Sequence, residues 1–155
     1  TFEIQSNSIE EIAKTSVLRS FEKCHLPIIV EDVGLFVEEL NGFPGPYASY
    51  VYRTIGNKGL LKLMKNIENR RANFHSTVAY YSSELEAPMC FEGEVSGEIT
   101  REEHKGSSGF GFDPIFKPLN SSKTFAEMNL AEKNAYSHRA KALRDFAKWY
   151  TKLPA

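Results

Sequence analysis

The chain has 155 residues, of which 41% are hydrophobic and 25% are charged, and this composition is typical of one globular domain with its own core. It excludes a fibrous or intrinsically disordered chain. Nineteen Lys and Arg against twenty Asp and Glu give a formal charge of -1, so we expect no nucleic acid and no membrane surface as a partner. No apolar run reaches the roughly 20 residues of a membrane-spanning helix, and the N-terminal residues lack the pattern of a secretory signal. We therefore expect a cytoplasmic location.

The first predicted element after the extended segment TFEIQ is an amphipathic helix. Ser8 and Glu11 have the spacing of a capping box, in which each side chain accepts a hydrogen bond from a free backbone N–H group. Apolar residues then recur at 3.6-residue spacing from Ile9 to Cys24, and Pro27 stops the helix. The sequence thus predicts a helix with one buried face.

Two adjacent acids, Glu31 and Asp32, follow a short apolar run at residues 26–30. The run predicts a strand covered on both faces, with the acids at its carboxyl end. Neighbouring carboxylates repel each other unless a cation neutralises them, and oxygen ligands of this kind suit Mg²⁺ or Mn²⁺. The alternative interpretation of the pair is a solvated turn or a helix cap.

The middle of the chain predicts a turn-rich loop, two helices and two strands. In order, these are the loop at residues 41–49, helices at 47–55 and around 60–67, and alternating strands at 72–81 and 89–100. Gly93 and Gly97 in the second strand indicate bulges or a bend. The pattern predicts an antiparallel strand pair within an α/β domain built on a mixed sheet.

Residues 105–118 form a glycine-rich aromatic loop, KGSSGFGFDPIFKP. Glycines allow the backbone to approach a ligand closely, and the rings of Phe110 and Phe112 offer flat faces on which a base can stack. Asp113 is held in place by the proline that follows it. The alternative is a tight turn whose aromatic residues belong to the core.

A third segment, EKNAYSHRAKAL at residues 132–143, concentrates Lys133, His138 and Arg139. If Ser137 is a helix N-cap, His138 and Arg139 lie in the first helical turn, where backbone N–H groups also lack partners. Cations are unfavourable there on helix-dipole grounds, so the arrangement indicates an anionic or carbonyl ligand. The alternative is one continuous helix from about Leu130 with these side chains in water.

The segments VEDVGLFVEELNGFPGPY, SGFGFDPIF and EKNAYSHRAKAL together resemble the Ham1/inosine triphosphate pyrophosphatase family over about Glu3 to Ala142. The resemblance implies an elongated mixed β-sheet flanked by helices, with two lobes around a nucleotide cleft, in a homodimer. It implies Mg²⁺-dependent hydrolysis (Mn²⁺ is possible) of the non-standard purine nucleotides ITP, dITP and XTP to the monophosphate and pyrophosphate.

The resemblance also implies residue roles. Glu3 and Glu31 are similar to metal-associated acids, and Asp32 is similar to the catalytic aspartate that activates water or holds the metal. The base-binding strip corresponds to Phe110, Gly111, Phe112 and Asp113. Lys133 is similar to a nucleotide-contacting lysine, and His138 and Arg139 to the readers of the 6-oxo group.

The sequence departs from the family pattern at its N-terminal end. The family opens with a strand and a phosphate-binding (S/T)-G-N-x-x-K loop that this sequence does not contain. We therefore expect residues 1–155 to be a single domain that lacks its first strand and phosphate loop. This leaves a rival hypothesis, a non-hydrolytic nucleotide-binding or oligomerisation module; an enzyme for modified pyrimidine nucleotides is a second rival.

Overall fold

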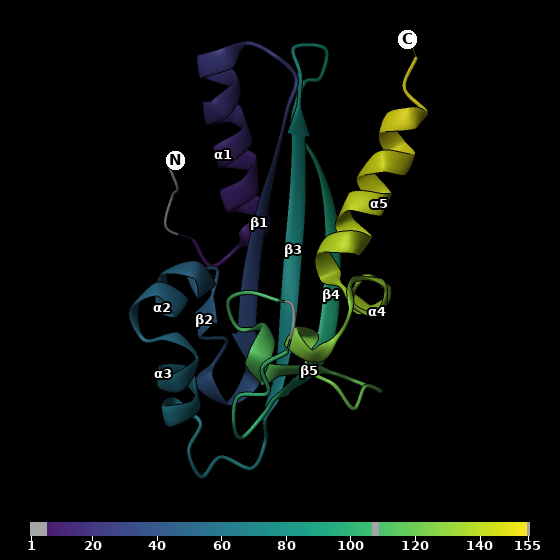
Figure 1. The fold of residues 1–155 in the computed structure, drawn as a ribbon. Helices are drawn as coiled ribbons and strands as arrows, with labels where there is room; N and C mark the ends of the chain where they lie inside the picture. The colour runs from purple at the N-terminus through teal and green to yellow at the C-terminus, as the bar shows by residue number, and fades with distance from the viewer. Residues whose placement is uncertain (1–5, 107–108, 155) are drawn as a thin grey trace.

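The computed structural model describes residues 6–106 and 109–154, which form a five-stranded sheet with helices on both faces (Figure 1). The α-helices are α1 (Ile9–Cys24), α2 (Ala48–Thr54), α3 (Gly56–Leu63), α4 (Leu130–Tyr136) and α5 (His138–Thr151). The strands are β1 (Ile28–Val37), β2 (Pro44–Gly45), β3 (Arg71–Tyr81), β4 (Met89–Ile99) and β5 (Phe116–Pro118). Three short 3₁₀ helices are η1 (Glu38–Leu40), η2 (Asp113–Ile115) and η3 (Phe125–Glu127). The α/β class predicted from the sequence is confirmed.

Helix α1 begins as its capping residues predict. The Ser8 hydroxyl accepts a hydrogen bond from the Glu11 N–H at 3.2 Å. The reciprocal half differs, because the Glu11 carboxylate accepts from the Ser6 hydroxyl at 3.1 Å rather than from the backbone of Ser8. The helix ends at Cys24, where His25 takes a left-handed conformation with φ 56° and its N–H bonds to the Phe21 carbonyl.

The long strands separate two helical layers. Ala79 of β3 packs against Ala13 and Val17 of α1, whereas the next residue, Tyr80, contacts the ring of Trp149 on α5 with centroids 5.5 Å apart. Successive residues of a strand point to opposite faces, so α1 and α5 cover opposite sides of the sheet. Figure 1 shows the two helices on either side of β1, β3 and β4. We refer below to the α1 face and the α5 face.

The sheet order is β2-β1-β3-β4-β5, and every pairing among the described residues is antiparallel. The sequence predicted a mixed sheet because residues 26–30 are apolar on both sides of the strand. The expectation that this run is covered on both faces is also wrong, because Leu26 is 65% exposed and Ile29 is 42% exposed. A short apolar run does not by itself reveal the direction of the neighbouring strand.

Of the two features that the sequence predicted at the glycines of β4, bulges or a bend, bulges are excluded because the register with β3 runs without interruption. Gly93 instead allows the backbone of α5 to lie close to the sheet, and Gly97 allows the neighbouring strand β5 to lie close to β4. A Cβ atom at Gly93 would lie 2.0 Å from the His138 carbonyl oxygen, and one at Gly97 would lie 2.3 Å from that of Lys117. Gly93 therefore sets the position of the first turn of α5.

A hydrophobic core on the α5 face connects one end of the sheet, near Leu35 of β1 and Ile99 of β4, to α2, α3 and the short 3₁₀ helices. Its fully buried members include Leu35, Leu60, Ile115, Phe116 and Phe125. This packing supports the aromatic loop that precedes η2. Within the described part of the chain, no helix is long and apolar enough to cross a bilayer.

Candidate active site

The aromatic loop presents one exposed ring on a fixed backbone. Gly109 and Gly111 have positive φ angles of 94° and 61°, a conformation that favours glycine. The Phe110 N–H between them donates to Asp113 Oδ2 at 3.0 Å. The Phe110 side chain is 65% exposed, so the alternative that this ring belongs to the core is excluded.

Phe112 differs from Phe110, because its side chain is only 4% exposed. Its ring packs edge-on against Tyr52 of α2 with centroids 5.4 Å apart. Of the two stacking faces expected from the sequence, only that of Phe110 is open to a ligand. The sequence could not separate them, since the positive φ of Gly111 turns the chain between two identical residues.

Lys133 lies beside the Phe110 ring and is held by Asp113. Its Nζ is 2.6 Å from Asp113 Oδ2 and 5.0 Å from the centroid of the Phe110 ring, within the range of a cation–π contact. Asp113 is 6% exposed, so its carboxylate is buried and paired with a cation. The predicted base-binding aspartate thus fixes the loop and orients the lysine.

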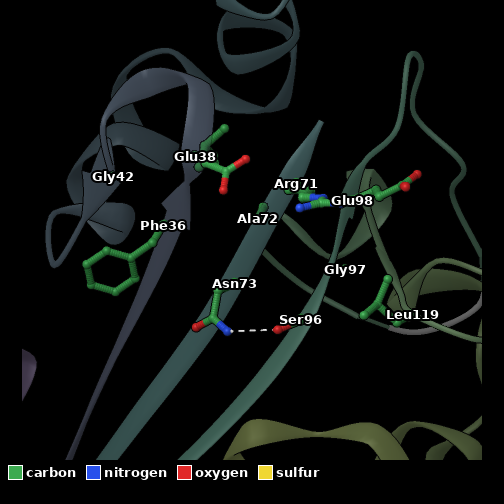
Figure 2. A pocket seen from close by; sticks show the side chains of 11 residues that line it. Phe36, Glu38, Gly42, Arg71, Ala72, Asn73, Ser96, Gly97, Glu98 and Leu119 are labelled. Atoms are coloured by element: carbon green, nitrogen blue, oxygen red, sulfur yellow. Dashed lines mark hydrogen bonds between the residues drawn. The ribbon is translucent and has the colours of Figure 1, made fainter. Parts of the chain in front are cut away.

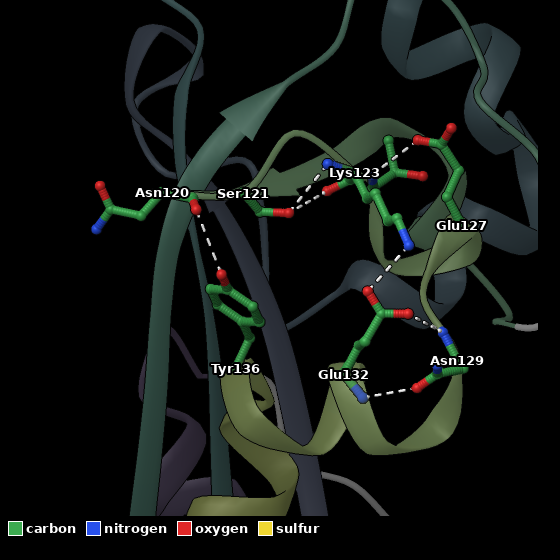
Figure 3. A network of polar contacts seen from close by, with 8 residues as sticks. Asn120, Ser121, Lys123, Glu127, Asn129, Glu132 and Tyr136 are labelled. Carbon is green, nitrogen blue, oxygen red and sulfur yellow. Dashed lines mark hydrogen bonds and ion pairs between the residues drawn. The ribbon is translucent and has the colours of Figure 1, made fainter.

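A polar network places α4, which carries Lys133 (Figure 3). Asn129 and Glu132 form a capping box at the start of α4, and Lys123 reaches Glu132 with an Nζ–Oε2 distance of 2.9 Å. The Tyr136 hydroxyl donates to the Asn120 carbonyl at 3.3 Å at the other end of the helix. Both ends of α4 are therefore anchored to the preceding loop.

The helical conformation is interrupted at Ser137, between α4 and α5, and this excludes the alternative of one continuous helix. The Ser137 hydroxyl accepts from the Ala140 N–H at 3.3 Å and caps α5, which is the first of the two interpretations that the sequence left open. His138 and Arg139 are consequently the first two residues of α5.

His138 is buried against the sheet. Its ring stacks on Phe74 of β3 with centroids 4.8 Å apart and an interplanar angle of 3°, and its Nδ1 has no hydrogen-bond partner within the described chain. Burial, followed by the charges of Arg139, Lys133 and His75, lowers the pKa of His138 to about 3. The imidazole is therefore neutral at physiological pH.

Acid should destabilise the fold through His138. An unfolded histidine has a pKa near 6.5, so between pH 6.5 and about 3 the unfolded chain binds a proton that the native imidazole rejects. The contribution to stability is complete above pH 6.5 and is lost as the pH falls. Lowering the pH from 7.5 to 5.0 should reduce the free energy of unfolding by about 2 kcal/mol through this group, measured by urea denaturation.

The control for this prediction is His138→Phe, which keeps an aromatic ring on Phe74 but has no proton to bind. The same pH change should reduce the unfolding free energy of this variant by about 2 kcal/mol less than that of the parent chain. Equal pH dependence in both proteins would contradict the assignment.

Glu31 and Arg139 form a bidentate ion pair on the α5 face. Arg139 Nη2 lies 2.7 Å from Glu31 Oε1, and Nε donates to Oε2 at 3.1 Å. The hydroxyl of the fully buried Ser76 donates to the same Oε2 at 3.4 Å. The Arg139 guanidinium carbon is 5.3 Å from the centroid of the Phe110 ring. Sequence patterns gave no signal for Ser76 or for this pairing.

Asp32 lies on the other face of the sheet. The sequence prediction that both acids lie at the carboxyl end of their strand is wrong, because both are inside the ten-residue strand β1. Asp32 is the register partner of Thr77, and Glu31 that of Val78. Because β2 pairs only with Leu35 and Phe36, the part of β1 that carries both acids is a sheet edge among the described residues. The two carboxylates flank this edge from opposite faces.

The three acids that the sequence predicts at a metal are only partly described by the structure. Glu3, the third predicted metal-associated acid, lies outside the described residues. Within the part that the structure describes, no group of three or more His, Cys, Asp or Glu side chains is arranged to hold a metal. The three predicted metal-associated acids therefore remain a prediction.

Asn57 of α3 is a further residue that the sequence reading missed. Its Nδ2 donates to the Gly111 carbonyl at 3.2 Å, so α3 braces the loop that carries Phe110. A pocket of about 560 Å³ lies elsewhere, around Asn73 and Ser96 (Figure 2), and no predicted site residue of the described chain lines it. The predicted base-binding residues instead surround Phe110.

Comparison with known proteins places this arrangement in a family. The model of the Ham1 family matches residues 1–149. This chain belongs to the Ham1 family.

Two relatives that are about half identical to this chain share the name "dITP/XTP pyrophosphatase". The "dITP/XTP pyrophosphatase" of Hyperthermus butylicus is 51% identical over 95% of this chain and 76% of the relative. That of Methanopyrus kandleri is 52% identical over 96% of this chain and 78% of the relative. The Ham1 protein of Staphylococcus aureus, at 30% identity, superposes with a TM-score of 0.88 over 97% of this chain and 79% of its own. The Ham1 fold predicted from the three motifs is confirmed.

Proposed function

We propose that this chain hydrolyses the non-standard purine nucleotides ITP, dITP and XTP to the monophosphate and pyrophosphate. One observation carries the proposal: the exposed Phe110 ring lies between two cations, Lys133 and Arg139, in a chain about half identical to dITP/XTP pyrophosphatases. A stacking face flanked by cationic donors suits a purine ring with oxo groups and an attached polyphosphate.

Selectivity for 6-oxo purines follows from the donors beside Phe110. The ion pair with Glu31 uses Nε and Nη2 of Arg139. The proposed donor to an oxygen at position 6 is the remaining guanidinium nitrogen, Nη1. Adenine presents an amino group at that position and leaves a donor unpaired, which costs about 1–3 kcal/mol. We expect ATP to be a poor substrate. His138 supports this end of the site as a neutral, buried ring.

Hydrolysis is assigned to Asp32. A purine stacked on Phe110 lies on the α5 face, and its phosphates can extend toward the carboxylate of Asp32 over the edge of β1 that has no partner strand among the described residues. There Asp32 orients or deprotonates the attacking water. Cleavage of the bond between the α- and β-phosphates requires this positioned water and neutralisation of the phosphates.

Mg²⁺ is the proposed cofactor, and Mn²⁺ is the proposed substitute. Mg²⁺ is usually bound by one or two carboxylates together with substrate phosphates, so a cage of three protein acids is not required. Asp32 is the described residue that fits this role. When bound, the ion neutralises phosphate charge.

We also propose a cytoplasmic homodimer with no nucleic-acid or membrane partner. The balanced charge supports the absence of a nucleic-acid or membrane partner. Exposed aromatic side chains on and beside α2, which are Phe43, Tyr47, Tyr50 and Tyr52, provide apolar surface of the kind found in subunit interfaces.

The test of the function is pyrophosphate release by the full chain from ITP, dITP, XTP and ATP, with Mg²⁺ and with EDTA. We expect rapid release from the first three with Mg²⁺, at least tenfold slower release from ATP, and none with EDTA. Nucleotide binding, measured separately by calorimetry, distinguishes the rival hypothesis. Tight binding of ITP without pyrophosphate release would favour the non-hydrolytic module.

A further inference from the structure

We propose that Glu31 is a positioning residue that holds Arg139 beside the Phe110 ring, and that it is not a ligand of Mg²⁺. The inference rests on the proposed function, because it assigns a role within the same purine site. It separates the two acids that the sequence places side by side: Asp32 acts on the phosphates, and Glu31 acts on base recognition through Arg139.

The ion pair between Glu31 and Arg139 fixes the orientation of both side chains. Two contacts of 2.7 and 3.1 Å join both carboxylate oxygens of Glu31 to Nη2 and Nε of Arg139, and Ser76 supplies a third polar contact. A bidentate pair of this kind fixes the plane of the guanidinium as well as its position. The Glu31 side chain is 22% exposed and that of Arg139 40%, so solvent screens the pair only in part.

The pair has a counterpart on Lys133. Asp113 holds Lys133 with a 2.6 Å contact, and Lys133 Nζ is 5.0 Å from the Phe110 centroid; Glu31 holds Arg139, whose guanidinium carbon is 5.3 Å from the same centroid. Each cation beside the ring is thus oriented by its own acid. This parallel assigns Glu31 to the aromatic site.

The same geometry opposes a metal role for Glu31. Both of its oxygens already contact the guanidinium, and a cation ligated there would have to displace Arg139 from Phe110. Glu31 and Asp32 are consecutive in a regular strand, so their carboxylates diverge to opposite faces and cannot meet on one ion.

The decisive experiment measures binding of inosine monophosphate by calorimetry in EDTA, where metal ligation cannot contribute. Glu31→Gln keeps the side-chain shape but removes the charge that orients Arg139, and we expect its Kd to rise about tenfold. Arg139→Lys should raise the Kd similarly, and the double variant should be no weaker than the weaker single variant. Asp145→Asn, which breaks an exposed ion pair with Lys141 on the same helix, should bind as the parent chain does.

The Mg²⁺ concentration for half-maximal pyrophosphate release provides a second readout. We expect it to change less than twofold in Glu31→Gln. Unchanged binding of inosine monophosphate in EDTA together with a raised Mg²⁺ requirement would overturn the inference and return Glu31 to the metal. Ser76→Ala, which removes one contact of Glu31, should raise the Kd in the same direction if Glu31→Gln does not fold; parental binding would then count against the inference.

These outcomes are distinct from failure of the proposed function. A parent chain that binds no inosine monophosphate and releases no pyrophosphate from ITP would refute the function itself. A parent chain that does both, with binding in EDTA unaffected by Glu31→Gln, would refute only the role of Glu31.

Discussion

Asp32→Asn should reduce pyrophosphate release from ITP about a thousandfold, because the amide keeps the shape of the side chain but can neither accept a proton from water nor carry charge near the phosphates. The loss should lie in kcat, since Asp32 is on the opposite face from the ring that binds the base. Binding of inosine monophosphate in EDTA should remain within twofold of the parent value. Steady-state release assays and calorimetry provide these measurements.

A matched control is Glu94→Gln, which neutralises an exposed carboxylate on the same face of the sheet as Asp32. This variant should keep the parental kcat, and both variants should unfold within a few degrees of the parent. Retained turnover in folded Asp32→Asn would refute the catalytic assignment. Equal losses in both variants would show that the charge of the face matters, rather than Asp32 itself.

Phe110→Ala should raise the KM for ITP about tenfold, the effect expected when a base loses a stacking face worth about 1–3 kcal/mol. The Phe110 ring is 65% exposed, so its removal leaves no cavity in the core and should not lower the thermal stability. Inorganic pyrophosphate has no base to stack, so its inhibition constant should be the same for Phe110→Ala as for the parent chain. The measurement compares the KM for ITP with that constant.

The control is Tyr150→Ala, which removes another exposed aromatic ring, near the C-terminal end of α5. Its KM for ITP should stay within twofold of the parent value. If Phe110→Ala weakened ITP and pyrophosphate equally, the ring would support the loop rather than stack on the base. A fall in melting temperature comparable to that of a core substitution would point to the same conclusion.

Local signals in the sequence predicted the elements that depend on neighbouring residues. The caps at Ser8 and Ser137 act within three residues, and both helices begin where these signals place them. The alternation of β3 and β4 is likewise a local pattern, and both strands form. The glycines around Phe110 predicted a sharply turning loop, and two of them take positive φ angles.

The prediction was less accurate where a role depends on distant segments. The sequence treated Phe110 and Phe112 alike, and only packing against Tyr52 of α2 separates the buried ring from the exposed one. It also ended the first strand before the acids, because a polar pair looks like the end of a buried strand. Pairing with β3 carries β1 through that pair to Val37.

The sequence by itself determined the family and the residues from which the site is built, because three motifs and their order are properties of the chain. The tertiary structure decided what each residue does. The register of β1 with β3 sends Glu31 to the α5 face and Asp32 to the α1 face, and the close approach of α5 at Gly93 brings Arg139 to Glu31 across 108 residues. The physical reason is that side-chain direction in a strand and burial of a ring depend on partners far away in sequence.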